Sequence, residues 1–166
     1  MKILGIDPAL NKTGWGVIEI IDNNVLKYVA SGIIEVSKEP DMVHKLKAIS
    51  RQLAEIVATF LPDEIAIEET FVNKNPATSL KLGHARGAMM ATCLNHTDHI
   101  YEYGANQIKK SVCGVGKAEK QQVAMMVKVL LPQAQFEYDD ESDALAVAIT
   151  HHHLRSFNEV LKSTGS

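Results

Sequence analysis

Residues 1–36 read MKILGIDPALNKTGWGVIEIIDNNVLKYVASGIIEV, and this stretch decides the fold. Lys2–Asp7 is a short apolar segment that ends at an acid. Gly14–Ile20 and Val25–Val36 are rich in β-branched residues, which is typical of strands. The polar turn Asp22-Asn23-Asn24 separates these two segments, as in a hairpin. The chain is therefore predicted to begin with three strands, and we expect them to be antiparallel.

Beyond residue 36, predicted helices alternate with short strands. A helix starts near Pro40, carries apolar residues at helical spacing and ends before Pro62. The next elements are the strand Glu64–Glu68, the helix Pro76–Leu94, the strand Ile100–Tyr103 and the helices Ala105–Ser111, Lys117–Leu130 and Asp140–Phe157. This order predicts an α/β fold, a mixed five-stranded sheet flanked by helices, in a single domain over residues 1–157. We expect residues 158–166 to form a flexible tail.

The composition is that of an ordinary globular domain. The chain has 166 residues, of which 46% are hydrophobic and 22% charged. No apolar run reaches the roughly 18 residues of a membrane span, and Asp7 interrupts the first apolar segment too early for a signal peptide. We therefore expect a cytoplasmic protein without membrane contact. Cys93 is expected in the core, and a reactive thiol at Cys113 is the less favoured alternative to packing.

Charge is unevenly distributed. The net charge is −3, but residues 74–128 hold eight Lys or Arg against three acids. Basic residues of this kind hold phosphates, while the acids elsewhere are free to hold a cation. On charge alone, a solvated helix face explains the pattern equally well.

Four acids occupy unusual positions. Asp7 closes an apolar strand, and Glu68 ends the apolar run Ile65–Ile67, where an unpartnered ionised carboxylate is very costly to bury. Asp140 and Asp143 are three residues apart at the start of a helix that is apolar on all sides. If the four acids converge, a divalent cation has to neutralise them. An all-oxygen set favours Mg²⁺ or Mn²⁺, with one or two ions able to assist hydrolysis of a phosphodiester.

Structural roles explain several other residues and motifs more simply than functional ones. Asp139 and Glu141 are expected to cap the last helix. The run His151–His153 is expected to form a cationic helix end or a solvated face rather than a metal site. Gly114–Lys117 lacks the first glycine and the Ser/Thr of a phosphate-binding loop. Phe71 lies in a polar loop and is a candidate for stacking on a base.

Four stretches together resemble the RuvC-type Holliday junction resolvases: GIDPALNKTGWGV, AIEETFVNKNPATSLKLGHARG, YEYGANQIKKSVCGVGKAEKQQV and DESDALAVAITH. The resemblance covers about residues 1–155. It implies a ribonuclease-H-like fold and a homodimer that binds a four-way DNA junction. It also implies symmetric nicks in two strands of like polarity during recombination and repair, and a branch-migration helicase complex as partner.

The resemblance also implies residue roles. The catalytic, metal-binding acids would be Asp7, Glu68, Asp140 and Asp143, and water activation would fall to Asp143 or Lys120. The family's DNA-contacting aromatic would be Phe71, and its lysines on the catalytic face would be Lys109 and Lys120. From the basic segment we also expect contacts to DNA by Lys74, Lys81, Arg86, Lys110 and Lys117. Gly83 and Gly87 would permit close approach of two copies. The family usually has glycine where this chain has Ala9, which questions the shape of the first loop if it requires a positive φ.

Three alternative functions compete with this interpretation. An actin-like or sugar-kinase phosphotransferase needs a second Asp-x-Gly loop, which the chain does not have. A nuclease for RNA in hybrids would share the fold, although Phe71 and the basic segment suit branched DNA better. A module that binds junctions without cutting them would not need all four acids.

Overall fold

The computed structural model describes the backbone of residues 1–22, 25–70 and 75–164, with side chains described up to Arg155. Five strands form one sheet in the order β3-β2-β1-β4-β5. They are β1 (Lys2–Asp7), β2 (Lys12–Ile21), β3 (Val25–Glu35), β4 (Glu64–Glu68) and β5 (Ile100–Tyr103). Neighbours among β1, β2 and β3 are antiparallel, whereas β4 is parallel to β1 and β5 to β4. The predicted mixed five-stranded sheet is confirmed.

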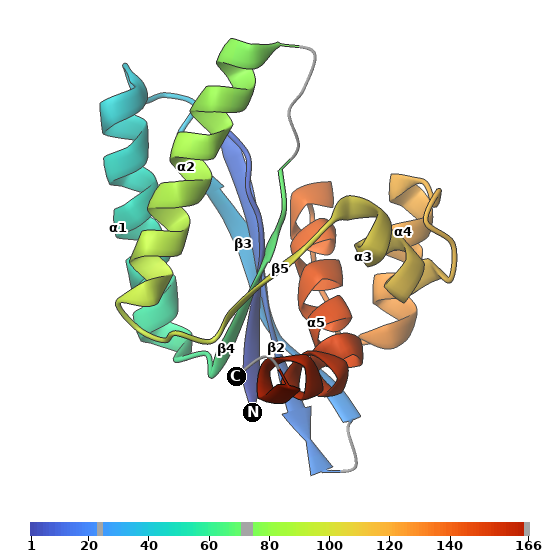
Figure 1. The fold of residues 1–166 in the computed structure, drawn as a ribbon. Coiled ribbons are helices and arrows are strands. Elements are labelled where there is room, and N and C mark those ends of the chain that lie inside the picture. Colours follow the sequence, from blue (N-terminus) through green and yellow to red (C-terminus); the bar gives the residue numbers. More distant parts are fainter. Residues whose placement is uncertain (23–24, 71–74, 165–166) are drawn as a thin grey trace.

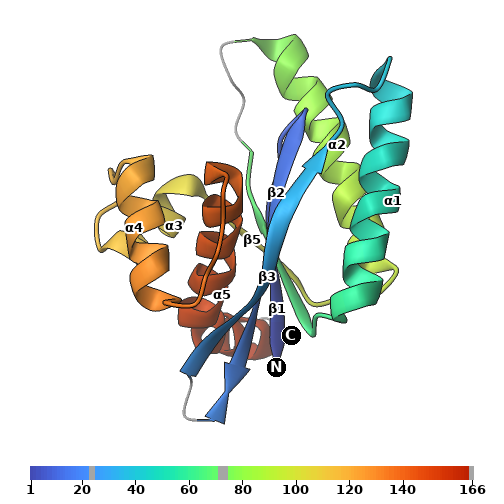
Figure 2. The ribbon, with the colours of Figure 1, turned by 180° about the vertical axis from the view of Figure 1, so that it is seen from behind.

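Helices cover both faces of this sheet (Figure 1, and from behind in Figure 2). α1 (Met42–Phe60) and α2 (Pro76–Leu94) lie on one face, and α3 (Ala105–Cys113), α4 (Lys120–Leu130) and α5 (Asp139–Thr164) lie on the other. Side chains alternate along a strand, so β1 contributes Leu4 and Ile6 to the core under α1 and α2, and Ile3 to the core under α5. No helix in the described part of the chain is long and apolar enough to cross a membrane.

α5 rests directly on the sheet. Its residues from Ala144 to Ile149 have no exposed surface. The strands beneath it carry glycine at the points of closest approach. A Cβ added to Gly5 would overlap the carbonyl oxygen of Ala144, and one added to Gly14 would overlap the carbonyl oxygen of Asp140. The first turn of α5 is thereby pressed against the ends of β1 and β2.

Three helix ends differ from the prediction, each for a local reason. α3 continues to Cys113 and ends where Gly114 adopts a left-handed conformation, with φ of 80°. α4 begins at Lys120 rather than at Lys117, because Glu119 and Gln122 cap its start reciprocally. α5 continues past Phe157 to Thr164, since no glycine or proline interrupts the chain before Gly165. Most of the predicted tail is therefore helical.

Candidate active site

Asp7 and Glu68 end neighbouring parallel strands. Ile6 of β1 pairs with Ile67 of β4, so each acid is the next residue along its strand. Asp7 shares a strand face with Ile3, and Glu68 shares one with Ala66. Both of these apolar residues lie in the core under α5. The two carboxylates therefore meet on the face of the sheet that α5 covers.

A cavity of about 220 Å³ brings Asp143 of α5 to the same place. Asp7, Glu68 and Asp143 line it together with Lys109 and Lys120, and the remaining lining residues are Ala105, Ile108, Val123 and Ala146. The structure thus gathers three of the four predicted acids in one hollow. Asp140, half-buried one turn earlier in the helix, does not line the cavity, although its charge still raises the pKa of Asp7.

Crowding of buried carboxylates disfavours their charged forms. Burial, followed by the charges of Glu68 and Asp143, raises the pKa of Asp7 from 3.8 to about 8. Burial is also the largest cause that raises the pKa of Glu68 and of Asp143. Asp7 consequently holds a proton at neutral pH unless a cation replaces it.

Lys120 supplies part of the missing positive charge. Its Nζ lies 3.6 Å from Oδ2 of Asp143, and the charge of Asp143 raises the pKa of the lysine. Lys109 of α3 lines the cavity and acts on Glu68, whose pKa its charge lowers against the larger effect of burial. Both lysines are therefore placed to contact an anion that enters beside the carboxylates.

The other predicted DNA-contacting residues lie outside the cavity. Lys110 is exposed on α3, Lys117 is exposed in the turn before α4, and Lys81 is exposed on α2. Arg86 of α2 is mostly buried and forms an ion pair with Glu102 of β5, so it joins a helix to the sheet edge. The predicted roles of Phe71 and Lys74 fall outside the described residues.

Ala9 fits the loop that follows Asp7. Within the described backbone, Leu61 is the only non-glycine residue with a positive φ, so the loop does not require glycine at residue 9. The buried Thr13 closes the turn instead. Its hydroxyl donates to the carbonyl oxygen of Ala9 and accepts from the N–H of the same residue, at 3.1 and 3.2 Å. The departure from the family pattern therefore leaves Asp7 in place.

The donor set of the cavity fits a hard divalent cation. Its acidic side chains offer carboxylate oxygens, and neither cysteine nor histidine lines it. Mg²⁺ and Mn²⁺ prefer such oxygen ligands. As these side chains stand, no three His, Cys, Asp or Glu residues in the described chain lie close enough to surround an ion. An ion would therefore have to draw the carboxylates inward and displace the ammonium of Lys120 from Asp143.

The expectations for Glu141 and for the two cysteines have clear outcomes. Glu141 behaves as the predicted cap, since its carboxylate accepts from the N–H groups of Glu137 and Tyr138, both at 3.0 Å, and also from the hydroxyl of Ser31. Cys93 is fully buried, and burial raises the pKa of its thiol to about 12. Burial also raises the pKa of Cys113, which argues against a reactive thiol there.

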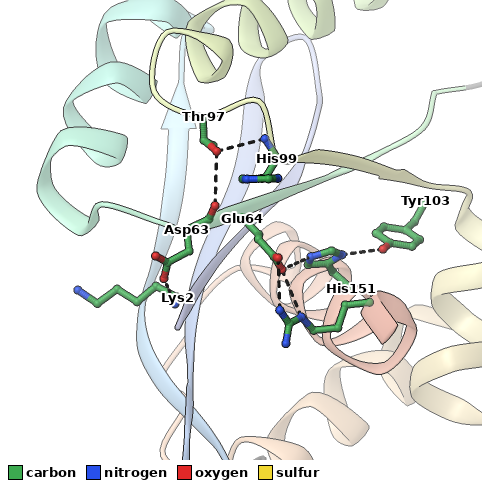
Figure 3. Close-up of polar contacts among 8 residues, drawn as sticks. Lys2, Asp63, Glu64, Thr97, His99, Tyr103 and His151 are labelled. Atoms are coloured by element: carbon green, nitrogen blue, oxygen red, sulfur yellow. Dashed lines mark hydrogen bonds and ion pairs between the residues drawn. The ribbon is translucent and has the colours of Figure 1, made fainter. Parts of the chain in front are cut away.

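The expectation of a solvated face was wrong for His151. This residue is fully buried and bonds to Tyr103 and Glu64 beneath α5 (Figure 3). Burial alone would raise the pKa of Glu64, but hydrogen bonds from His151 and Arg155 hold it below its ordinary value. The signal in the sequence was Glu64 itself, an acid at the start of a buried strand and on the same face as Glu68.

Known proteins resemble this chain over nearly its whole length. The family model described as crossover junction endodeoxyribonuclease RuvC matches residues 3–151. The protein of that name from Beijerinckia indica subsp. indica is 49% identical over 163 residues, which cover 98% of this chain and 93% of the relative.

Two solved structures of Thermus thermophilus RuvC share the fold. The protein alone has a TM-score of 0.84 at 28% identity and covers 95% of this chain and 97% of its own. Its complex with a Holliday junction substrate has a TM-score of 0.87 at 27% identity, with coverage of 95% and 96%. The ribonuclease-H-like prediction is thereby confirmed. The chain belongs to the RuvC family of crossover junction endodeoxyribonucleases.

Proposed function

We propose that this protein resolves four-way DNA junctions by paired, symmetric nicks, with Mg²⁺ held by Asp7, Glu68, Asp140 and Asp143. The observation that carries the proposal is the shared cavity, where carboxylates from β1, β4 and α5 meet beside Lys109 and Lys120. The Thermus thermophilus relative bound to a Holliday junction supports the choice of substrate. Mn²⁺ is expected to substitute for Mg²⁺, since both favour oxygen ligands.

Asp143 and Lys120 have separable roles in this proposal. Bound Mg²⁺ would supply Lewis-acid stabilisation of the charge that develops on the phosphate oxygens. The pKa of Lys120 is raised by Asp143, so the lysine keeps its proton at neutral pH. In that state it can hold a phosphate or donate a proton to the leaving oxygen. We assign to Asp143 the role of orienting and deprotonating the attacking water.

The homodimer is proposed to form through α2. Leu80 and Leu94 are 64% and 51% exposed, and Gly83 and Gly87 have no neighbouring atoms within 4 Å of an added Cβ. With His84 and Ala91, also exposed, these residues follow helical spacing and form one stripe along the helix. Such an apolar, small-residue stripe lets a second copy approach closely across a two-fold axis, which would place two cavities on one junction. The helicase complex remains a prediction from the family.

A synthetic four-way junction labelled on each strand in turn tests the function. With Mg²⁺, we expect nicks at symmetric positions in one pair of opposite strands, and no nicks when EDTA removes the ion. Sedimentation should show two chains per particle. Linear duplex and RNA–DNA hybrid of equal length serve as controls for the alternative nuclease. Equal cutting of the hybrid, or cutting that survives EDTA, would contradict the proposal.

Acidity should stabilise the metal-free protein through Asp7. Its folded pKa of about 8 lies above its ordinary 3.8, so between these values the folded state binds a proton that the unfolded state has lost. This contribution to stability is present at low pH and disappears as the pH rises through about 8. In EDTA, the Tm of Asp7→Asn should therefore exceed that of the unaltered protein by a margin that grows from pH 5.5 to 8.5. A constant or shrinking margin would contradict the assignment.

A further inference from the structure

A buried network of hydrogen bonds joins α5 to the sheet (Figure 3). His151 lies at its centre, with Nε2 2.7 Å from Oε2 of Glu64 in β4 and Nδ1 2.7 Å from Oη of Tyr103 in β5. All three residues are at most 9% exposed, and Arg155 lies 3.4 Å from the same carboxylate. An ionised carboxylate can only accept, so Nε2 of His151 donates to Glu64, while Nδ1 forms the second hydrogen bond with the hydroxyl of Tyr103.

The residues of this network and the acids of the cavity are separated by matching distances along β4 and along α5. Glu64 and Glu68 share one face of β4 and lie four residues apart, about 13 Å along the strand. Asp143 and His151 lie eight residues apart, about 12 Å along the helix. The two acids on β4 are therefore about as far apart as the two residues on α5, so the helix contacts the strand at two points. One is the Glu64–His151 hydrogen bond, and the other is the cavity that Glu68 and Asp143 share.

The other contacts between α5 and the sheet are close backbone approaches and apolar packing. Gly5 lies against Ala144 and Ala148, Gly16 lies against Leu145, and Leu145 and Ile149 share a core with Ile3 and Ile18. Apolar packing is not directional, whereas a hydrogen bond requires a defined distance and angle. A slide of one residue moves the helix by about 1.5 Å, which is enough to break hydrogen bonds of 2.7 Å at both nitrogens of His151.

We propose that Glu64, His151 and Tyr103 are positioning residues. They hold α5 at one position along its own axis and thereby set the position of Asp143 relative to Glu68. The inference rests on the proposed function, which assigns an ion to those two acids. Buried polar groups that lose their hydrogen-bond partners destabilise the protein. A position of α5 that breaks the hydrogen bonds of His151 is therefore disfavoured. The metal ligands are thereby held in register from a distance of about two helical turns.

His151→Phe tests the proposal, because it keeps a ring in the space and removes both hydrogen bonds. Mg²⁺ affinity should fall about tenfold, as for other residues that orient metal ligands. The loss should appear in calorimetric titration and as a smaller rise in Tm on adding Mg²⁺. Junction affinity in EDTA should not change. Glu64→Gln keeps a carbonyl acceptor for Nε2 and should retain most of the Mg²⁺ affinity. If His151→Phe does not fold, Tyr103→Phe, which keeps the hydrogen bond between His151 and Glu64, should give a smaller loss in the same assays.

Thr150→Val is the matched control. Thr150 is fully buried beside His151, and its hydroxyl donates to the carbonyl oxygen of Ala146 in the same helix. This variant should lower Tm without altering Mg²⁺ affinity. Unchanged Mg²⁺ affinity in His151→Phe, or an equal loss in Thr150→Val, would overturn the positioning role. Asp143→Asn separates this failure from a failure of the proposed function. If Asp143→Asn still binds Mg²⁺ and cuts normally, the proposed function itself is wrong.

Discussion

An Asp7→Asn variant is expected to bind a four-way junction as tightly as the unaltered protein and to cut it more slowly by a factor on the order of 10³ or more. Asparagine keeps the shape of the side chain but cannot take the negative charge that neutralises a cation. The loss of charge also removes one source of repulsion among the buried acids. The metal-free variant should therefore be at least as stable as the unaltered protein, and the loss of cutting cannot be ascribed to unfolding.

Asp139→Asn is the control for this prediction. Asp139 is exposed at the start of the same helix and does not line the cavity. Its replacement changes the net charge by the same amount and should leave the cleavage rate within about twofold, as surface changes away from a site do. Single-turnover cleavage and junction affinity in EDTA measure the two effects separately. Undiminished cutting by Asp7→Asn would refute the role assigned to Asp7.

Gly14→Ala should have the next largest effect, through the backbone of α5. Gly14 pairs with Asp7 across β1 and β2, and an added methyl group overlaps the carbonyl oxygen of Asp140. The first turn of α5 has to move, which costs about 1–3 kcal/mol of overpacking. In a chain of this size that lowers Tm by roughly 2–12 °C. Displacement of Asp143 by about 1 Å should also reduce cleavage about 10²-fold.

Gly116→Ala provides the comparison. Gly116 has room for a methyl group, since the nearest atom would be the carbonyl oxygen of Asn106 at 3.5 Å. Tm and cleavage should both stay close to those of the unaltered protein. The informative measurement is cleavage at a temperature where Gly14→Ala is fully folded by circular dichroism. Normal cutting there would mean that the start of α5 tolerates displacement.

Local patterns were sufficient to predict the elements of this fold. Strands β1 to β3 and the long helices follow from alternation and helical spacing, which depend on neighbouring residues only. The acids were predictable because Asp7 and Glu68 end apolar strands, where a charge is conspicuous. Helix ends were less accurate, as at Lys120, because a cap depends on a reciprocal pair of hydrogen bonds rather than on periodicity.

Local patterns could not predict which residues the fold brings together. Of Asp140 and Asp143, only Asp143 lines the cavity, because residues three apart on a helix point about 60° away from each other. Asp140 acts on Asp7 through its charge. His151 was expected to be solvated because three histidines in a row suggest a polar surface. Its burial depends on which side of α5 meets β4, and that is decided by glycines more than a hundred residues earlier in the chain.

The cavity combines residues from the two ends of the chain, and this has a consequence for synthesis of the protein. One acid of the cavity is the seventh residue, and another belongs to a helix that begins at Asp139. A ribosome therefore exposes the sheet and most of the basic surface before it releases the helix that completes the cutting centre. A chain that ends before this helix lacks Asp143 and leaves one face of the sheet uncovered, so it has neither a complete core nor a complete cavity.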